Sequence, residues 1–292
     1  MAAFTHGYWW SNDGLRLHYR DYAGGDPGRP PIICIPGLTR NARDFDGVAN
    51  ALAGEWRVIC VDLRGRGESA YAKDPMTYVP LTYVQDLEAL LRTLELERFI
   101  LFGTSLGGLL SMLLAAAERG RVEGALINDV GPELDEAGMV RIRAYVGRSA
   151  SWPTWVHAAR DLSDVHKVSF PDWGLEEWLG FAKNVAKLSN SGRVVLDYDM
   201  RIAEPFRIAA PVAGMDMWGA WRALQGVPTL IVRGEVSDIL APATAERMQA
   251  EHDQAELVTI PRTGHAPTLN EPEARQGVAR LLARVAERLA IA

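Results

Sequence analysis

The stretch "LFGTSLGG", from Leu101 to Gly108, places a polar serine among glycines and between two apolar runs. The residues before the serine, 99–103, form a short apolar run with strand character. The residues after it, 106–117, are apolar almost throughout and rich in leucine and alanine, which are strong helix formers. Ser105 is therefore predicted to lie on a tight turn between a strand and a helix.

The glycines around Ser105 give this turn a chemical interpretation. Residues 103–107, "GTSLG", fit the pattern G-x-S-x-G, in which a nucleophile is raised above a sheet on a strained turn. Side chains two positions before and after the serine would collide there, so both positions need glycine. The N-terminus of the next helix would direct its N–H groups toward charge that develops on a substrate. An ordinary glycine turn is the alternative, and the strand-to-helix position favours the nucleophile.

The chain around this turn alternates between predicted strands and predicted helices. The strands are short apolar runs at 15–22, 31–35, 57–62, 99–103, 125–129, 229–233 and 256–260. The helices are expected at 43–52, 79–94, 106–117, 241–250 and 272–289. Such alternation predicts an α/β fold with a doubly wound, mostly parallel sheet. In such sheets, functional side chains gather at the carboxyl ends of the strands.

The alternation stops between Gly131 and Arg222, a stretch of helices and loops without a clear parallel strand. We therefore expect an α/β core formed by residues 1–130 and 223–292, and a helical cap formed by residues 131–222. Six of the nine tryptophans lie in this cap, which suggests a lid over an apolar pocket. Most of them should pack the cap onto the sheet. Trp152 and Trp155 are the two that we expect to face a ligand.

A serine hydroxyl needs a base to become a good nucleophile, and His265 is the best placed of six histidines. It lies between the last predicted strand and the last predicted helix, where Gly264 and Pro267 favour a loop. That loop is expected at the sheet edge where Ser105 emerges. Of the other histidines, His6 and His18 precede the sheet core, and His157 and His166 fall in the cap. His252 is expected to be solvated.

The base in turn needs an acid that holds its tautomer and stabilises the imidazolium. Asp238 follows the strand at 229–233 and is the preferred candidate, because its loop directly precedes the loop of His265. Asp129, which ends the previous strand, is a geometric rival. Glu235 is a weaker substitute. The chain order serine, acid, histidine holds for each choice.

Two backbone N–H groups are needed to stabilise the oxyanion of an acyl-transfer reaction. We expect one donor from Leu106, directly after the nucleophile, and the other from Leu38 in the loop "PGLTRN". Gly37 permits the tight turn of that loop.

Composition limits the classes of partner. The chain of 292 residues is 48% hydrophobic and 23% charged, with a formal net charge of -6, which is typical of a globular protein and argues against nucleic acid or an anionic membrane surface. The start lacks the pattern of a secretory signal, and the longest apolar stretch is too short to span a bilayer. Cys34 and Cys60 lie in apolar runs and are expected to be reduced and buried. These features predict a cytoplasmic protein.

The histidines are scattered without metal-ligand spacing, so we expect neither a metal nor another cofactor. The expected partner is a small apolar molecule, and the oligomeric state remains open.

Five motifs together resemble the α/β-hydrolase superfamily, in the form with an inserted cap: "PGLTRN", "DLRGRGES", "GTSLGG", "RGEVSD" and "GHAP". The resemblance implies an eight-stranded sheet, a triad of Ser105, Asp238 and His265, and a cap between the sixth and seventh strands. The oxyanion loop of such proteins usually begins His-Gly, and here it begins with Pro36, which leaves the backbone donor in place. "DLRGRGES" is expected to be structural, with Arg64 and Arg66 paired to acidic neighbours. A serine in place of aspartate at the turn argues against a haloalkane dehalogenase or an epoxide hydrolase.

The favoured function is that of a serine hydrolase that cleaves a carboxylic ester or a lactone through an acyl-enzyme. Hydrolysis of a carbon–carbon bond in a diketone-like ring-cleavage product is an alternative, because the same triad performs it in related proteins. Such substrates carry carboxylates, and Arg40 is the candidate to bind them. A ligand-binding protein without catalysis is the alternative from another class.

Overall fold

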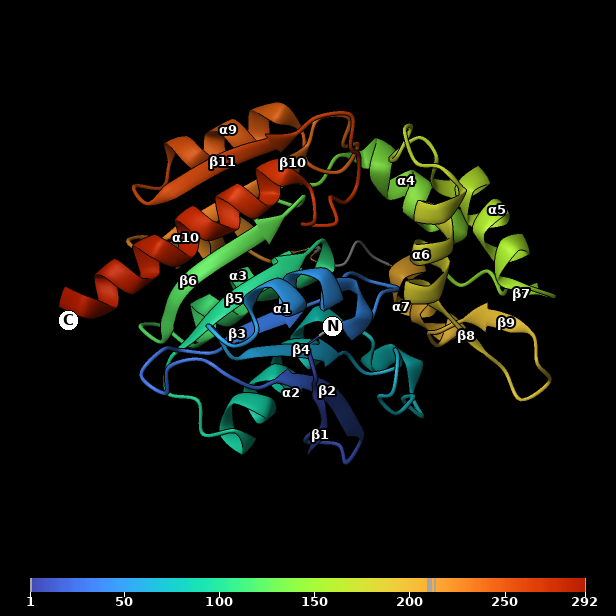
Figure 1. Ribbon diagram of the computed structural model, residues 1–292, viewed down its shortest axis with the longest axis horizontal. Coiled ribbons are helices and arrows are strands. Elements are labelled where there is room, and N and C mark those ends of the chain that lie inside the picture. Colours follow the sequence, from blue (N-terminus) through green and yellow to red (C-terminus); the bar gives the residue numbers. More distant parts are fainter. Residues whose placement is uncertain (1, 209–211, 213, 292) are drawn as a thin grey trace.

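The computed structural model describes residues 2–208, 212 and 214–291 and is built on an eight-stranded sheet (Figure 1). The strand order is β1-β2-β4-β3-β5-β6-β10-β11. β2 pairs antiparallel with β1 on one side and with β4 on the other. The other neighbours in this order, from β4 through β3, β5, β6 and β10 to β11, pair in parallel. The bounds are β1 (Thr5–Trp10), β2 (Arg16–Tyr22), β3 (Ile32–Ile35), β4 (Val58–Asp62), β5 (Phe99–Thr104), β6 (Val122–Asn128), β10 (Thr229–Gly234) and β11 (Ala255–Ile260).

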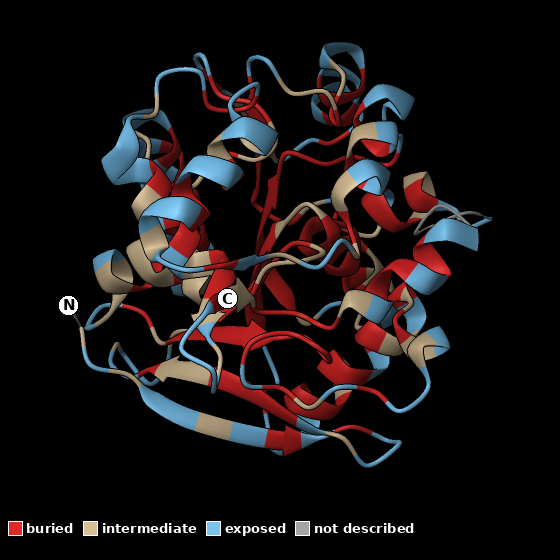
Figure 2. Cartoon of the chain, turned by 90° about the vertical axis from the view of Figure 1, so that its right-hand side faces the viewer, coloured by how far each residue is buried: buried red, intermediate tan, exposed pale blue. Residues whose placement is uncertain are grey.

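Helices cover both faces of the sheet and enclose two apolar cores. One core includes buried residues of α1 and α10, and the other includes those of α2, α3, α9 and α8 (Met217–Arg222). Figure 2 shows the buried central strands between helices whose outer sides are exposed. The core helices are α1 (Asp46–Leu52), α2 (Pro80–Thr93), α3 (Leu106–Ala117), α9 (Pro242–Ala250) and α10 (Pro272–Ile291). The predicted α/β fold is confirmed.

The seven predicted strands are all present, with ends that lie within three residues of the predicted ones. The eighth strand, β1, was not located by sequence, because its residues show little apolar alternation. Only Trp9 of this strand is buried. β1 is an edge strand that pairs with β2 alone, so most of its side chains face solvent.

Residues 129–228, between β6 and β10, form an insertion into the sheet topology. The insertion lies on the side toward which the arrowhead of β6 points in Figure 1. It has its own apolar cluster, which includes Trp152, Trp178 and Phe181, and a three-stranded antiparallel sheet of order β7-β9-β8. Its elements are α4 (Glu136–Tyr145), β7 (Ser151–Trp152), α5 (Trp155–His166), α6 (Leu175–Val185), β8 (Ala186–Leu188), β9 (Val194–Leu196), α7 (Ala203–Ile208) and α8 (Met217–Arg222).

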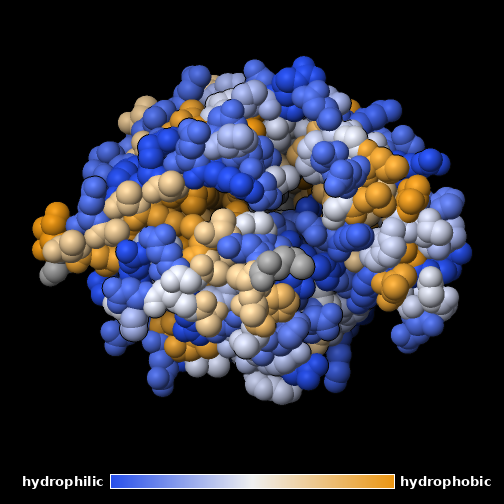
Figure 3. All heavy atoms as spheres, in the orientation of Figure 1, coloured by the Kyte–Doolittle hydropathy of each residue, from blue (hydrophilic) through white to orange (hydrophobic). Residues whose placement is uncertain are grey.

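The surface of the insertion carries apolar side chains. Figure 3 shows them as orange patches on the right, where Figure 1 places α4, α5 and α6. In the described part of the insertion, the large apolar side chains that are exposed are Val140, Val156, Val165, Val168, Leu175, Leu188 and Ile208. None of the helices in the described ranges is both long enough and apolar enough to cross a membrane.

Two arginines of "DLRGRGES" are buried, but only one has acidic partners. Arg64 forms hydrogen-bonded ion pairs with Asp86 and Asp13. Arg66 instead donates to the carbonyl oxygens of Leu38 and Arg64 and to the hydroxyl of Tyr83. The expectation of an acidic partner is thus wrong for Arg66, whose guanidinium supports a loop through backbone carbonyls.

His252 is buried, which contradicts the expected solvation. Its Nε2 lies 2.8 Å from the carbonyl oxygen of Leu224, and its ring packs against Trp221. Burial lowers the pKa of this imidazole. The polar residues around His252 suggested an exposed side chain, because they continue the exposed C-terminal end of α9.

Both cysteines are free and buried, as expected. Cys34 on β3 and Cys60 on β4 are register partners in adjacent parallel strands. Burial raises the pKa of the Cys60 thiol, so this group is a small core residue rather than a thiolate.

Candidate active site

The turn between β5 and α3 has the strained geometry expected for it. Ser105 adopts φ 54° and ψ -118°, which is a rare conformation for a residue with a side chain. A Cβ atom at Gly107 would lie 1.9 Å from the carbonyl oxygen of Ile35, and one at Gly103 would lie 2.3 Å from the carbonyl oxygen of Gly107. Both positions therefore exclude any larger residue.

Three side chains from distant parts of the sequence form one hydrogen-bonded series. Nε2 of His265 lies 2.8 Å from Oγ of Ser105, and Nδ1 of His265 lies 2.8 Å from Oδ2 of Asp129. The side chain of Asp129 is completely buried and that of His265 is 8% exposed. The carboxylate thus contacts one ring nitrogen while the other faces the hydroxyl. This arrangement can take a proton from the serine and hold the resulting imidazolium.

The loop after β10 fixes the carboxylate of Asp129. The N–H of Gly234 donates to Oδ1 at 2.8 Å, and the hydroxyl of Ser237 donates to Oδ2 at 2.7 Å. The backbone of Asp129 has φ 56°, and its N–H donates to the carbonyl oxygen of Val232. With His265 as a third donor, the carboxylate has a single orientation.

Asp238 does not contact His265, so the preferred acid of the sequence analysis is wrong on geometry. Its carboxylate forms a two-pronged ion pair with Arg141 of α4, with Nε–Oδ2 at 2.5 Å and Nη2–Oδ1 at 2.7 Å. Burial alone would raise the pKa of Asp238, but the guanidinium of Arg141 lowers it below its ordinary value. The loop after β10 presents Ser237 to Asp129 and turns Asp238 toward the insertion.

Glu235, the weaker substitute, also has another role. Its Oε2 accepts the N–H of Arg262 at 2.7 Å, and it lies on the exposed side of the loop. The rival named in the sequence analysis, Asp129, is therefore the residue that meets the histidine.

A cavity of about 540 Å³ opens beside Ser105 and His265. The sheet core and the insertion both line it, and the lining includes Leu38, Arg40 and Trp152. Trp155 is not among the described residues that line the cavity. It packs instead against the apolar cluster of the insertion, so the expectation that it faces a ligand is wrong.

The loop after β3 lies against the serine, as a source of oxyanion donors requires. A Cβ atom at Gly37 would lie only 3.5 Å from Cβ of Ser105. Within the described part of the chain, the N–H groups of Leu38 and Leu106 have no hydrogen-bond acceptor. Leu106 is the first residue of α3, where N–H groups lack helical partners. Both donors are free to bind a substrate oxygen.

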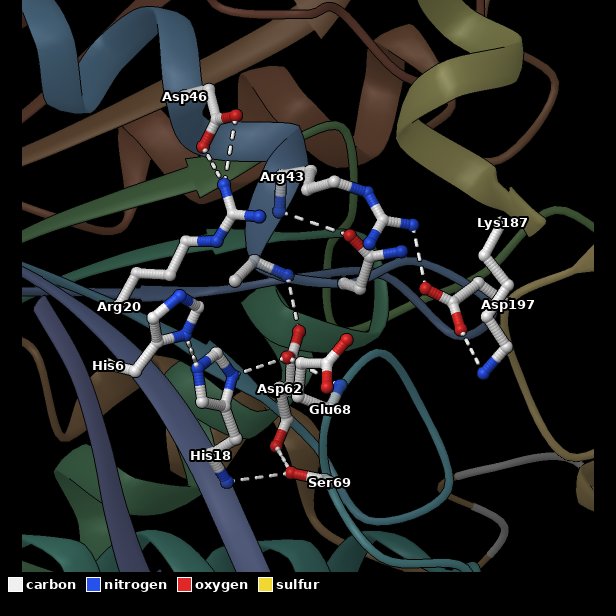
Figure 4. A network of polar contacts seen from close by, with 12 residues as sticks. His6, His18, Arg20, Arg43, Asp46, Asp62, Glu68, Ser69, Lys187 and Asp197 are labelled. Carbon is white, nitrogen blue, oxygen red and sulfur yellow. Dashed lines mark hydrogen bonds and ion pairs between the residues drawn. The ribbon is translucent and has the colours of Figure 1, made fainter. Parts of the chain in front are cut away.

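The buried carboxylate of Asp62 supports this loop through hydrogen bonds with backbone N–H groups (Figure 4). Oδ1 of Asp62 accepts the N–H of Ala42, and Oδ2 accepts the N–H of Glu68 and contacts Nδ1 of His18 at 2.7 Å. Nε2 of His18 lies 2.8 Å from Nδ1 of His6. The sequence analysis gave no role to Asp62, because nothing in "DLRGRGES" reveals which backbone groups its carboxylate meets.

A second set of contacts in Figure 4 joins the same loop to the insertion. Arg43 donates to Oδ2 of Asp197 at 2.7 Å, as Figure 4 shows. Arg43 also donates to the carbonyl oxygen of Asn184 at 3.1 Å. Asp197 is buried and its Oδ1 also lies 2.8 Å from Nζ of Lys187. These contacts fix the position of the insertion relative to the loop.

Arg40 lines the cavity but already has a counter-ion. Its guanidinium is paired with the carboxylate of Asp44, with Nε–Oδ2 at 2.6 Å. It also lies 4.4 Å from the ring centroid of Phe181. Among the residues that the structure describes, no three histidine, cysteine or acidic side chains gather in a way that could hold a metal.

Comparison with known proteins agrees with this fold. The family model for the alpha/beta hydrolase family matches residues 32–280. A 3-hydroxybutyrate-oligomer hydrolase of Cupriavidus necator is 37% identical over 265 residues, which cover 88% of this chain and 89% of that protein. The sn-1-specific diacylglycerol lipase of Mus musculus is 28% identical over 85% of this chain and 79% of its own length.

A solved structure supports the same assignment. An alpha/beta hydrolase from Novosphingobium aromaticivorans DSM 12444 is 55% identical, has a TM-score of 0.92, and the match covers 97% of this chain and 99% of that one. The family match and these similarities show that the chain is a hydrolase that belongs to the alpha/beta hydrolase family.

Proposed function

We propose that this hydrolase cleaves carboxylic esters with Ser105 as nucleophile, His265 as general base and Asp129 as the acid that orients the histidine. The hydrogen-bonded series of these three side chains at the cavity carries the proposal. The order along the chain is serine, acid, histidine, and the strained turn exposes the serine to the cavity.

The proposed reaction proceeds through an acyl-enzyme. Oγ of Ser105 attacks the ester carbonyl carbon while its proton passes to Nε2 of His265. The negative oxygen of the tetrahedral intermediate accepts hydrogen bonds from the N–H groups of Leu38 and Leu106. The carbon–oxygen bond then breaks, and the leaving alcohol takes the proton from Nε2.

Water completes the cycle by the same route. His265 accepts a proton from the water as its oxygen attacks the acyl carbon, and Ser105 leaves with that proton. The products are one carboxylic acid, one alcohol and the unchanged enzyme. Asp129 stabilises the imidazolium in both halves of the reaction without taking its proton.

The similarity to a 3-hydroxybutyrate-oligomer hydrolase supports small esters of hydroxy acids as the substrates, with lactones as a related class. The cavity volume suits a ligand of this size. Carbon–carbon bond hydrolysis of an anionic diketone is less favoured, because the charge of Arg40 is already balanced by Asp44.

We also propose that residues 131–222 act as a cap that shields the acyl-enzyme from solvent and sets substrate choice. Residues of this segment line the cavity opposite the serine, including Ile142, Trp152 and Phe170. The ion pair between Arg141 and Asp238, and the contacts of Arg43 with Asp197, hold the segment over the site.

The decisive experiment measures turnover of 4-nitrophenyl butyrate, a 3-hydroxybutyrate dimer, a short lactone and a ring-cleavage diketone. The expected result is hydrolysis of the esters, loss of that activity in Ser105→Ala, and labelling of wild type but not Ser105→Ala by a fluorophosphonate. Turnover of the diketone alone would support the carbon–carbon alternative. Folded wild type that neither turns over an ester nor takes the label would support a binding protein.

A further inference from the structure

Among the polar side chains of the insertion that line the cavity, Tyr145 and His166 are two that have no hydrogen-bond partner in the described part of the chain. Tyr145 is the last residue of α4 and His166 is the last residue of α5. Neither the hydroxyl of Tyr145 nor a ring nitrogen of His166 has a partner among the residues that the structure describes. The catalytic series does not use them. A hydroxyl and an imidazole that line a cavity in this way are available to hydrogen-bond a bound ligand.

Aromatic and aliphatic neighbours hold the two side chains together. The ring of His166 meets that of Tyr145 edge to face, with centroids 5.1 Å apart. On its other side lies Phe181, whose centroid is 5.5 Å away. Leu162 and Val165 of α5 line the same part of the cavity. The two polar groups therefore lie among apolar side chains on this side of the cavity, with the guanidinium groups of Arg40 and Arg141 nearby.

Both groups are uncharged near neutral pH. Burial, together with the positive charges of Arg40 and Arg141, lowers the pKa of His166 to about 3. Burial raises the pKa of Tyr145. A neutral imidazole offers one N–H donor and one nitrogen acceptor, and a phenol can donate and accept.

The two guanidinium groups that lower the pKa of His166 already have counter-ions, so they do not make this side of the cavity an anion site. Arg40 is paired with Asp44, and Arg141 is paired with Asp238. A ligand oxygen that is neutral and can both donate and accept, which is a hydroxyl, matches what Tyr145 and His166 present. In an ester of a hydroxy acid, the free hydroxyl belongs to the acyl half.

We propose that Tyr145 and His166 form a subsite that binds a hydroxyl group on the acyl chain of the substrate. The subsite rests on the proposed function in that the bound molecule is an ester cleaved at Ser105. It makes the enzyme selective for hydroxyacyl esters over plain acyl esters of the same length, because only the hydroxyl satisfies the two polar groups.

The test compares ethyl 3-hydroxybutyrate with ethyl butyrate, which differ only by the hydroxyl. Wild type is expected to show a higher kcat/KM for the hydroxy ester. His166→Phe and Tyr145→Phe should each reduce this preference about tenfold, which corresponds to one hydrogen bond, with the change mainly in KM. His157→Phe, the same substitution on the exposed side of α5, is the control and should keep the wild-type preference.

A binding measurement separates this inference from the proposed reaction. Calorimetry on Ser105→Ala is expected to give tighter binding of 3-hydroxybutyrate than of butyrate, and the difference should vanish with His166→Phe added. An equal preference in wild type and both single variants, or equal binding of the two acids, would overturn the subsite. If folded wild type turns over no ester but Ser105→Ala still binds 3-hydroxybutyrate more tightly than butyrate, the proposed reaction is overturned and the subsite is supported. If His166→Phe does not fold, the nearly isosteric Tyr145→Phe decides.

Discussion

Asp129, at the end of β6, lies 2.8 Å from Nδ1 of His265, although the loop after β10 is the nearer neighbour of the histidine loop in sequence. The loop after β10 supports this contact indirectly, since Gly234 and Ser237 donate to the same carboxylate. Two adjacent strands thus build one hydrogen-bonded unit. Asp129, directly after β6, provides the carboxylate, and the loop after β10 provides the donors that orient it.

This geometry makes opposite predictions for two aspartates. Asp129→Asn should lower kcat for an ester by about a thousandfold or more, because an amide cannot stabilise the imidazolium or fix its tautomer. Asp238→Asn should change kcat by less than tenfold, because its partner is Arg141. Steady-state kinetics with 4-nitrophenyl butyrate measures both.

Circular dichroism shows whether each aspartate variant keeps its fold. A larger loss of kcat in Asp238→Asn than in Asp129→Asn, with both proteins folded, would assign the acid to Asp238. A second informative variant is Ser237→Ala, which removes one donor to Asp129 and should cause an intermediate loss.

The glycine after the serine is predicted to be intolerant of the smallest substitution. A Cβ atom in Gly107→Ala would lie 1.9 Å from the carbonyl oxygen of Ile35, so the loop after β3 would have to move. We expect a loss of about 2 kcal/mol or more in the free energy of unfolding, together with loss of turnover. Urea unfolding measures the first quantity.

Gly120→Ala provides a comparison for Gly107→Ala. A Cβ at Gly120 meets no atom within 4 Å, although its φ of 80° carries a cost of its own. Turnover should therefore survive in Gly120→Ala. Full turnover in Gly107→Ala would mean that the turn adapts to a side chain.

Sequence predicted the sheet and the serine well, because these depend on local patterns. Apolar runs covered on both faces marked β3, β5 and β10, and the glycines around Ser105 marked the turn. His265 was found because the motif and its loop position agree.

The contacts between side chains that are far apart in the sequence could not be predicted from the sequence. Asp129 and Asp238 each follow one of two neighbouring strands, β6 and β10, and the direction of their side chains decides which of them meets His265. The same holds for Asp62, which meets Ala42, and for His252, which meets Leu224. Such contacts depend on how the loops pack against one another, and neither the spacing nor the periodicity of residues predicts that packing.

The contacts of Arg43 predict how firmly the insertion is held. Arg43→Met removes the hydrogen bonds to Asn184 and Asp197 and leaves buried Asp197 with Lys187 alone. We expect a loss of about 1 to 3 kcal/mol in the free energy of unfolding and faster proteolysis within the insertion. Mass spectrometry of a limited tryptic digest locates the cuts.

Arg193→Met is a matched control for Arg43→Met. Arg193 lies within the insertion and donates to Ser151 of the same segment, but it is exposed and does not reach the loop after β3. If both variants are cut equally fast, the bridge from Arg43 does not hold the insertion.

The pKa of His166 predicts how stability changes with pH. The folded protein binds no proton at this ring until the pH approaches 3, whereas an unfolded chain binds one near pH 6.5. The unfolded state therefore holds more protons between these values, so His166 makes the folded state less stable as the pH falls below 6.5. Above pH 6.5 it has no such effect. At pH 4.5 the cost is roughly 2 to 3 kcal/mol.

His166→Phe should abolish that cost, because phenylalanine does not titrate. Urea unfolding at pH 7.5 and pH 4.5 is expected to show a smaller loss of stability in His166→Phe than in wild type. Some pH dependence should persist, because burial also lowers the pKa of His252. His157→Phe, which removes an exposed imidazole from the same helix, should retain the wild-type difference between the two pH values. An equal loss of stability in wild type and His166→Phe would show that His166 takes up its proton in the folded protein at pH 4.5, so that burial does not hold its pKa below the ordinary value.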